Sequence, residues 1–220
     1  MSYSIAIDGP AGAGKSTIAK RIAKKMNYIY VDTGAMYRAM ALYLIQSQVD
    51  GSDTEAIARA CQSADISIEY RNGEQVVLLN GENVNAHLRT EKVGNMASVS
   101  SAVPAVREKL VELQQELAAK ADVVMDGRDI GTVVLPHADV KVYLTASSRT
   151  RANRRFLELR EKGEDADLEK IEQDIIERDY RDMHRETSPL RQAQDAVLVD
   201  SSNMTIDEVV ERIISLCRKK

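Results

Sequence analysis

The stretch that most constrains this chain lies at its front, where a short apolar run leads into a glycine-rich one. Residues 9–17 read GPAGAGKST, which fits the pattern G-x-x-x-x-G-K-[ST]. The apolar run 4–8 predicts a buried strand, and Ile18, Ile22 and Met26 recur at helical spacing after the loop. Such a loop between a strand and a helix cradles phosphates with its backbone N–H groups. The segment therefore predicts an α/β fold that binds a nucleotide.

Each residue type in this loop has a physical reason to be there. Glycine permits backbone angles and close approaches that a Cβ would block. Lys15 is expected to reach the β- and γ-phosphates, and the Ser16 hydroxyl to ligate Mg²⁺. We expect ATP to be bound by the whole loop, namely Gly9, Pro10, Ala11, Gly12, Ala13, Gly14, Lys15, Ser16 and Thr17.

Charge and composition exclude several other classes of protein. With 34 acidic and 30 basic side chains the formal charge is −4, which argues against general affinity for nucleic acid. The 2 cysteines and 3 histidines lack metal-ligand spacing. The first strand begins too early to leave room for a signal peptide, and no apolar run reaches membrane-spanning length. We expect a cytoplasmic protein without a membrane partner, and a monomer because no apolar stripe is left over.

Apolar runs alternate with helical patterns along most of the chain. Further strands are predicted at about residues 28–31, 123–125, 140–144 and 196–200. This alternation predicts a parallel five-stranded sheet, doubly wound and flanked by helices, in a chain long enough for one sizeable core.

The pattern changes between residues 65 and 84. Period-two alternation and two Asn-Gly pairs, at 72–73 and 80–81, predict a small antiparallel sheet of hairpins. We interpret this meander as an inserted substrate lobe. A purely structural flap is the alternative, because nothing in the hairpins is chemically reactive.

Charged residues gather where two predicted strands end, the edge at which open α/β sheets bind ligands. Tyr37 and Arg38 follow the second strand, and the run 126–129, Asp-Gly-Arg-Asp, follows the third. Asp126 is a candidate to hold Mg²⁺ through its water shell. The alternatives are that Arg38 is a solvated helix charge and that the run is a capped turn with a local ion pair.

An arginine-rich helix is predicted after the fourth strand. It carries five arginines around an apolar stripe, and a second charged helix follows it. Charge runs are usually solvated faces, but beside a phosphate-binding loop arginines can clamp a phosphoryl group in transfer. We therefore expect a short helical lid over about 148–185. The five arginines are Arg149, Arg151, Arg154, Arg155 and Arg160.

This layout favours a small-molecule kinase over the other nucleotide-binding classes. A regulatory GTPase needs a guanine-reading Asn-Lys-x-Asp stretch, which is absent, and a mechanochemical ATPase would belong to a larger assembly. We expect one kinase domain over residues 1–220. Its core would comprise about 1–35, 90–147 and 190–220, and its insert for a nucleoside monophosphate (NMP) about 36–89.

Four segments, 7–16, 32–38, 126–134 and 178–185, resemble bacterial cytidylate kinases, and the resemblance runs essentially end to end. It implies a P-loop NTPase-type fold and transfer of a phosphoryl group from ATP, with Mg²⁺, to CMP or dCMP. The products would be CDP or dCDP.

The resemblance also implies roles for individual residues. Asp129 would accept a hydrogen bond from the exocyclic amino group that uracil lacks, and so discriminate cytosine. Lid arginines Arg151, Arg154 and Arg155 would act with Lys15 and Arg128 as the catalytic set. The CMP site would comprise Thr33, Tyr37, Arg38, Ser98, Arg107, Arg128, Asp129, Arg178, Asp182 and Arg185.

Two alternatives stay open from the residues alone. One is another small P-loop kinase with a different acceptor, such as UMP or shikimate. The other is a nucleotide-binding switch protein without turnover.

Overall fold

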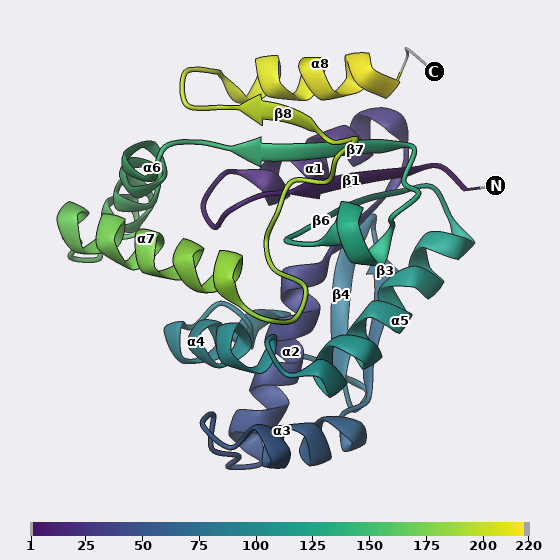
Figure 1. Ribbon diagram of the computed structural model, residues 1–220, viewed down its shortest axis with the longest axis vertical. Coiled ribbons are helices and arrows are strands. Elements are labelled where there is room, and N and C mark those ends of the chain that lie inside the picture. The colour runs from purple at the N-terminus through teal and green to yellow at the C-terminus, as the bar shows by residue number, and fades with distance from the viewer. Residues whose placement is uncertain (1, 218–220) are drawn as a thin grey trace. The chain divides into compact units, whose positions relative to one another are not determined.

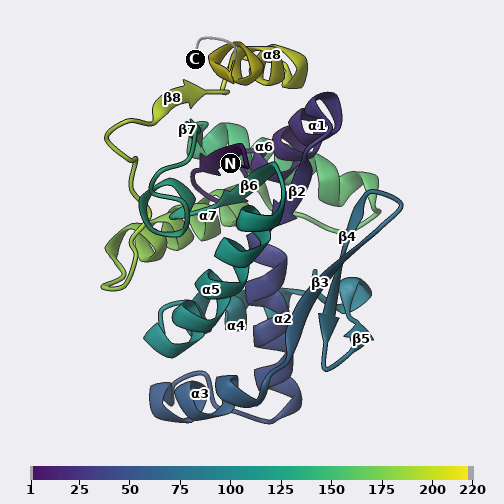
Figure 2. The same cartoon turned by 90° about the vertical axis from the view of Figure 1, so that its right-hand side faces the viewer.

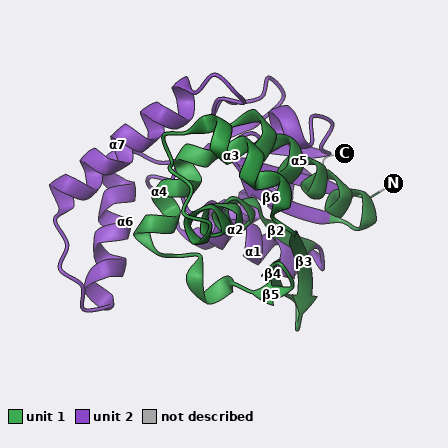
Figure 3. Ribbon diagram, turned by 90° about the horizontal axis from the view of Figure 1, so that it is seen from below, with its two compact units in different colours: residues 1–2, 29–122 green, residues 3–28, 123–220 purple. Residues whose placement is uncertain are grey.

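The computed structural model describes residues 2–217, and the chain folds into two compact units (Figure 3). The first, here the middle unit, comprises residues 29–122 with residue 2. The second, here the P-loop unit, comprises residues 3–28 and the chain after residue 122. The predicted insert 36–89 falls within the middle unit and the predicted lid 148–185 within the P-loop unit, while the single-domain division stays a prediction.

The main sheet has five strands in the order β2-β6-β1-β7-β8, as the alternating pattern predicted. β1 pairs in parallel with β6 and β7, and β7 with β8. Ile5, Ala6 and Ile7 of β1, whose side chains point to opposite faces in turn, are all fully buried, as in a parallel sheet covered on both faces. The strands are β1 (Ser4–Asp8), β2 (Ile29–Asp32), β6 (Val123–Gly127), β7 (Val140–Thr145) and β8 (Val197–Asp200).

Helices pack on this sheet within the P-loop unit. Figure 1 shows β1, β7 and β8 side by side with α8 (Ile206–Cys217) along them. α1 (Lys15–Met26) contacts β6 and α8, and α6 (Ser148–Glu161) packs against α7 (Leu168–His184). A π-helical turn, η3 (Ile130–Val134), follows β6. Of the helices that the structure describes, none has the length and apolar content that crossing a membrane requires.

The middle unit is built around α2 (Thr33–Gln46), which contacts α4 (Glu91–Ser100), α5 (Pro104–Lys120) and β4. Ala41 packs with Val93 and Ala97 in its core. The remaining helical elements are α3 (Thr54–Ala60), η1 (Cys61–Ser63) and η2 (Asn85–His87).

The predicted hairpins are confirmed as a three-stranded antiparallel sheet (Figure 2). Its strands are β3 (Ile66–Arg71), β4 (Glu74–Leu79) and β5 (Glu82–Asn83). At the first turn Asn72 and Gly73 have φ of 54° and 78°, and the second turn also has positive φ at both residues. Two central residues with positive φ match the twist of the strands, which is why Asn-Gly marks these turns.

Candidate active site

The glycine-rich loop runs from the end of β1 to the start of α1. Gly9 has φ of 148°, and a Cβ there would lie 1.9 Å from the Leu144 carbonyl oxygen. Gly14, at φ of 87°, is the N-cap of α1, and no side chain caps this helix or brings an acid into its first turn. The free N–H groups and the positive end of the helix dipole suit an anion. The geometry fits a phosphate-binding loop.

Lys15 is buried at the base of this loop, and its Nζ donates to the Pro10 carbonyl oxygen at 2.8 Å. Burial, followed by the positive charge of Arg128, lowers the pKa of Lys15 to about 7, although Asp126, Asp8 and Asp182 favour its charged form. Phosphate oxygens would restore the full positive charge, because an adjacent anion stabilises an ammonium group.

Ser16 and Asp126 form the candidate metal site. The Ser16 Oγ donates to Asp126 Oδ2 at 3.0 Å, across the first turn of α1 and the end of β6. Hydroxyl and carboxylate oxygens are ligands that Mg²⁺ takes, and Mg²⁺ completes its shell with water and substrate phosphates. Among residues 2–217 no cluster of three or more His, Cys, Asp or Glu forms a full protein cage. The donor set fits Mg²⁺ carried in with a nucleotide.

Two arginines, the buried Arg151 and the part-buried Arg128, are held by carboxylates of α7. Arg128 Nε donates to Asp182 Oδ2 at 2.8 Å, and Arg151 pairs with Asp179 Oδ2 at 2.7 Å. Arg151 also donates to the carbonyl oxygen of Ala11 at 3.0 Å, inside the glycine-rich loop. Burial opposes ionisation of Asp182, but the charge and hydrogen bond of Arg128, together with the charges of Arg178 and Arg185, outweigh it and hold the pKa of that carboxyl below its usual range. These pairs fasten α7 to the phosphate loop.

The remaining predicted site residues of the P-loop unit fall into two groups, those near Asp129 and Asp182 and those on α6. Asp129 is buried and lies 3.8 Å from Arg185, and Arg178 adds a favourable charge near Asp182. Arg154 instead donates to the Ser201 carbonyl oxygen at 2.8 Å.

Arg155, on the same helix as Arg154, is exposed and pairs with Glu158 at 3.0 Å. The structure thus gathers Lys15, Arg128, Arg151 and Asp182 into one set of interactions, while Arg154 and Arg155 bind elsewhere in the same unit.

The other predicted CMP residues lie in the middle unit. Thr33 opens α2, where the Asp32 carboxylate caps the helix by accepting from Ala35 N at 2.9 Å. One turn on, Arg38 lies over Gly34, with its Nη1 3.2 Å from the place a Cβ would take there. A basic side chain is therefore held at the start of α2.

Tyr37 and Arg107 come together from two helices. The Arg107 guanidinium lies 5.4 Å from the centroid of the Tyr37 ring, and its Nη1 donates to the Ser101 carbonyl oxygen at 3.2 Å. A cation over an aromatic face is stabilised by the ring quadrupole. This buried contact explains how a basic residue is tolerated in the first turn of α5. Ser98 lies on α4, half-buried.

Sequence reasoning missed three residues that hold these segments in place. Asp8 accepts from the N–H groups of Ile130 and Gly131, each at 2.7 Å. Asp179 anchors Arg151, as described above, and Gln75 exchanges two hydrogen bonds with the backbone of Asp32. Asp8 had one signal, because it follows a predicted strand directly at the sheet edge where ligands bind. Nothing local in the hairpin marked Gln75.

Comparison with known proteins gives consistent matches over the whole chain. A family model described as cytidylate kinase matches residues 5–219. Proteins named cytidylate kinase from Lactobacillus johnsonii and Caldicellulosiruptor saccharolyticus are 52% and 50% identical, covering 98% of this chain and 94% and 96% of their own. One from Streptococcus pneumoniae is 48% identical over 100% of this chain and 99% of its own length.

Solved structures match at the level of fold. A gluconokinase from Sinorhizobium meliloti aligns with a TM-score of 0.51 at 15% identity, over 99% of this chain and 93% of its own. A shikimate kinase from Bacteroides thetaiotaomicron aligns with a TM-score of 0.50 at 14% identity, over 98% of each chain. These likenesses confirm the P-loop kinase fold that the motifs predicted.

Proposed function

Because the chain belongs to the cytidylate kinase family, we propose that it transfers the γ-phosphoryl group of ATP to CMP or dCMP, giving CDP or dCDP. The observation that carries this proposal is the arrangement at two neighbouring strand ends of the P-loop unit. Lys15 and the glycine-rich loop follow β1, while Arg128 and Asp129 follow β6, which pairs with β1. The end of β1 suits a nucleoside triphosphate, and the end of β6 suits an anionic acceptor.

The donor half would be residues 9–17. Their backbone N–H groups and Lys15 bind the phosphates of ATP, and Arg151, which already donates to the loop carbonyl of Ala11, places a second cation beside them. Arg154 and Arg155 would act as lid arginines on the transferring group.

Ser16 would hold Mg²⁺, with Asp126 supporting its water shell. Bound with ATP, this ion neutralises charge on the β- and γ-phosphate oxygens. The hydrogen bond between Ser16 and Asp126 keeps both oxygens directed to the same place before a nucleotide arrives.

The acceptor half would comprise the predicted CMP residues. Thr33, Tyr37 and Arg38 line the monophosphate site, with Arg38 and Arg128 on the phosphate. Ser98, Arg107 and Asp129 read the cytosine, since a carboxylate accepts from the amino group that uracil lacks. Asp182 and Arg178 bind near the ribose hydroxyls, and Arg185 reaches the base or phosphate.

The chemistry needs no general base, because the attacking oxygen of CMP is already anionic. Rate is gained by aligning that oxygen with the γ-phosphorus and by neutralising charge in transfer through Lys15, Arg128 and the lid arginines. Closure of α6 and α7 would also exclude water, which otherwise competes as an acceptor. We further propose that the protein acts as a cytoplasmic monomer with a core, an NMP-binding insert and a lid.

A coupled phosphoryl-transfer assay across CMP, dCMP, UMP, AMP and shikimate tests the proposal. We expect turnover with CMP or dCMP well above the others, and none after Mg²⁺ is chelated. A higher kcat/KM with UMP or shikimate would replace the acceptor, and ATP hydrolysis without any acceptor would replace the reaction class. Tight ATP binding with no turnover on any acceptor would indicate a switch protein.

A further inference from the structure

A buried carboxylate that the proposed mechanism does not use, Asp8, ends strand β1 immediately before the glycine-rich loop. It is 5% exposed, and each of its two oxygens accepts one backbone N–H, from Ile130 and from Gly131, at 2.7 Å. These amides belong to the segment that follows β6, on the neighbouring strand. Asp8, the last residue of β1, thus connects this strand to the segment that follows β6.

The two amides are those that open the η3 turn. The turn's own hydrogen bonds begin with Val133 and Val134, whose N–H groups both donate to the Asp129 carbonyl oxygen, so the N–H groups of Ile130 and Gly131 come before its ladder. Leading amides of a helical turn need a partner from outside it. Asp8 supplies both partners.

The residue in the capping position of η3 is Asp129, and its side chain makes no capping hydrogen bond. This is unusual, because an aspartate there normally turns back to accept from the first N–H groups of its own helix. With those groups taken by Asp8, the Asp129 carboxylate stands 3.8 Å from Arg185 instead.

The contact is also sterically closed. A Cβ added at Gly131 would lie 3.3 Å from Asp8 Oδ2 and 3.2 Å from Lys141 Cδ. Contacts of this length are tight, so a side chain at Gly131 would push the turn away from Asp8. Burial raises the pKa of the Asp8 carboxyl to about 6, while the hydrogen bonds from Gly131 and Ile130 favour its ionised form, the better acceptor.

We propose that Asp8 is a positioning residue that caps the η3 turn in place of Asp129, and so leaves the Asp129 carboxylate directed at the substrate base. The inference rests on the proposed function, in which Asp129 reads cytosine. It predicts that a residue which never touches CMP sets the preference for CMP over UMP. Without Asp8, Asp129 would swing back to cap its own turn and lose contact with the base.

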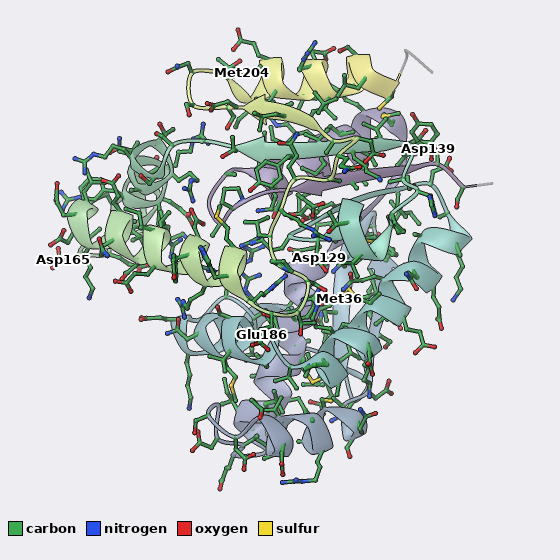
Figure 4. The ribbon with its side chains drawn as sticks, in the orientation of Figure 1. Met36, Asp129, Asp139, Asp165, Glu186 and Met204 are labelled. Carbon is green, nitrogen blue, oxygen red and sulfur yellow. The ribbon has the colours of Figure 1, made fainter. Side chains whose placement is uncertain are left out.

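The test compares Asp8→Asn with Asp139→Asn. Asp139 also accepts a backbone N–H of β1, that of Ser4 at 2.9 Å, but at the start of the strand (Asp129 and Asp139 are labelled in Figure 4). Asp8→Asn should lower the CMP-to-UMP ratio of kcat/KM about tenfold, the value of one charge-assisted hydrogen bond, and leave the KM for ATP much less affected. Asp139→Asn should leave the ratio unchanged.

Amide hydrogen exchange supplies a second readout that needs no substrate. Peptides covering residues 128–134 should exchange faster in Asp8→Asn than in the wild type, and at the wild-type rate in Asp139→Asn. Gly131→Ala keeps the Asp8 carboxylate but crowds its contact with the turn. It should therefore both lower the CMP-to-UMP ratio and speed exchange in 128–134, and it replaces Asp8→Asn if that variant does not fold.

The outcomes separate the two proposals. If the wild type prefers CMP but Asp8→Asn keeps both the ratio and the protection of 128–134, the role of Asp8 is wrong while the function stands. If the wild type shows no preference for CMP, the proposed function is wrong, and the exchange experiment alone decides whether Asp8 caps the turn. Equal losses of activity with CMP and UMP would reduce Asp8 to a structural residue.

Discussion

The two units hold their candidate site residues by different means. In the P-loop unit, buried ion pairs do so, such as Arg151 with Asp179 at 2.7 Å. In the middle unit, besides the Asp32 cap and the Arg107–Tyr37 contact, uncharged side chains support the strand that leads into α2. There the side-chain amide of Gln75 accepts from Asp32 N at 2.8 Å and donates to Asp32 O at 3.2 Å, and the Tyr70 hydroxyl donates to Tyr30 O.

The difference has consequences for what each unit tolerates. Removing one member of a buried ion pair leaves an uncompensated charge and costs about 3–5 kcal/mol, whereas a neutral hydrogen bond contributes about 1 kcal/mol. We therefore expect the P-loop unit to respond to substitution with large changes in rate and stability, and the middle unit with small changes in acceptor binding.

Lys15→Ala should have the largest effect. It removes the cation at the base of the phosphate loop, and we expect kcat with CMP to fall by about 10³-fold or more, with the fold intact. Initial rates and a thermal melt check this. Lys24→Ala, on the exposed side of the same helix, is the control and should behave as wild type. Near-normal turnover in Lys15→Ala would remove the phosphate loop from the mechanism.

Asp182→Asn should lower stability by about 2 kcal/mol at neutral pH, because it removes the carboxylate that accepts the hydrogen bond of the part-buried Arg128 guanidinium. The folded pKa of Asp182 lies below its unfolded value of about 3.9, since Arg128, Arg178 and Arg185 together outweigh the effect of burial. Its stabilisation is therefore present above that pH and is lost as the pH falls through the folded pKa.

Urea unfolding between pH 7 and pH 3 checks both the size and the sign of this effect. The gap in stability between wild type and Asp182→Asn should narrow as the solution becomes acidic. Asp207→Asn, which breaks an exposed pair with Arg21, is the control and should change stability by less than about 1 kcal/mol. A gap that widens in acid would contradict the assignment.

Asp129→Ala should reduce the discrimination between CMP and UMP and leave the fold intact. Losing the acceptor for the cytosine amino group should lower the CMP-to-UMP ratio of kcat/KM by about 10- to 100-fold, mostly through poorer use of CMP. Competition assays with both acceptors measure this ratio directly. An unchanged ratio would mean that another group reads the base.

Arg154→Ala separates the lid from the acceptor site. As a lid arginine it should lower kcat by about tenfold and change the KM for CMP little, because it would act on charge that develops in transfer. Arg160→Ala, also exposed on α6, is the matched control. The reverse pattern, a raised KM at normal kcat, would place Arg154 in the acceptor site.

Gln75→Leu should give the smallest effect. It breaks two neutral hydrogen bonds to Asp32, the cap of the helix that carries Tyr37 and Arg38, so the KM for CMP should rise about fivefold at unchanged kcat. Glu74→Ala, the exposed neighbour on β4, should change neither. If Gln75→Leu also leaves the KM unchanged, the hairpins are a structural flap, the alternative that the sequence left open.

The sequence predicted those parts of the molecule whose signals are local. The apolar runs marked all five strands of the sheet, because the inner strands are buried on both faces and the edge strand β8 is still apolar, although Leu198 is exposed. Both Asn-Gly pairs marked their turns, because this dipeptide tolerates positive φ at adjacent residues.

Other features could not be predicted because their partners are remote along the chain. Asp8 and Ile130 are separated by 122 residues, and Gln75 and Asp32 by 43. A side chain that hydrogen-bonds to the backbone needs no residue of opposite charge elsewhere in the sequence. The sequence therefore carries no signal of such a pair. The candidate site residues were named by motif, whereas the groups that orient them became visible only in three dimensions.

The P-loop unit consists of two separate chain segments, and this division affects the order in which the two units fold during synthesis. β1 is synthesised before both strands that flank it, because β6 and β7 lie beyond residue 122. The middle unit is nearly continuous in sequence, so it can fold before the strands that pair with β1 have been synthesised. Closing this long loop is an entropic barrier that local contacts do not lower. The nucleotide loop is thus synthesised before the strands that flank it and becomes ordered only once those strands exist.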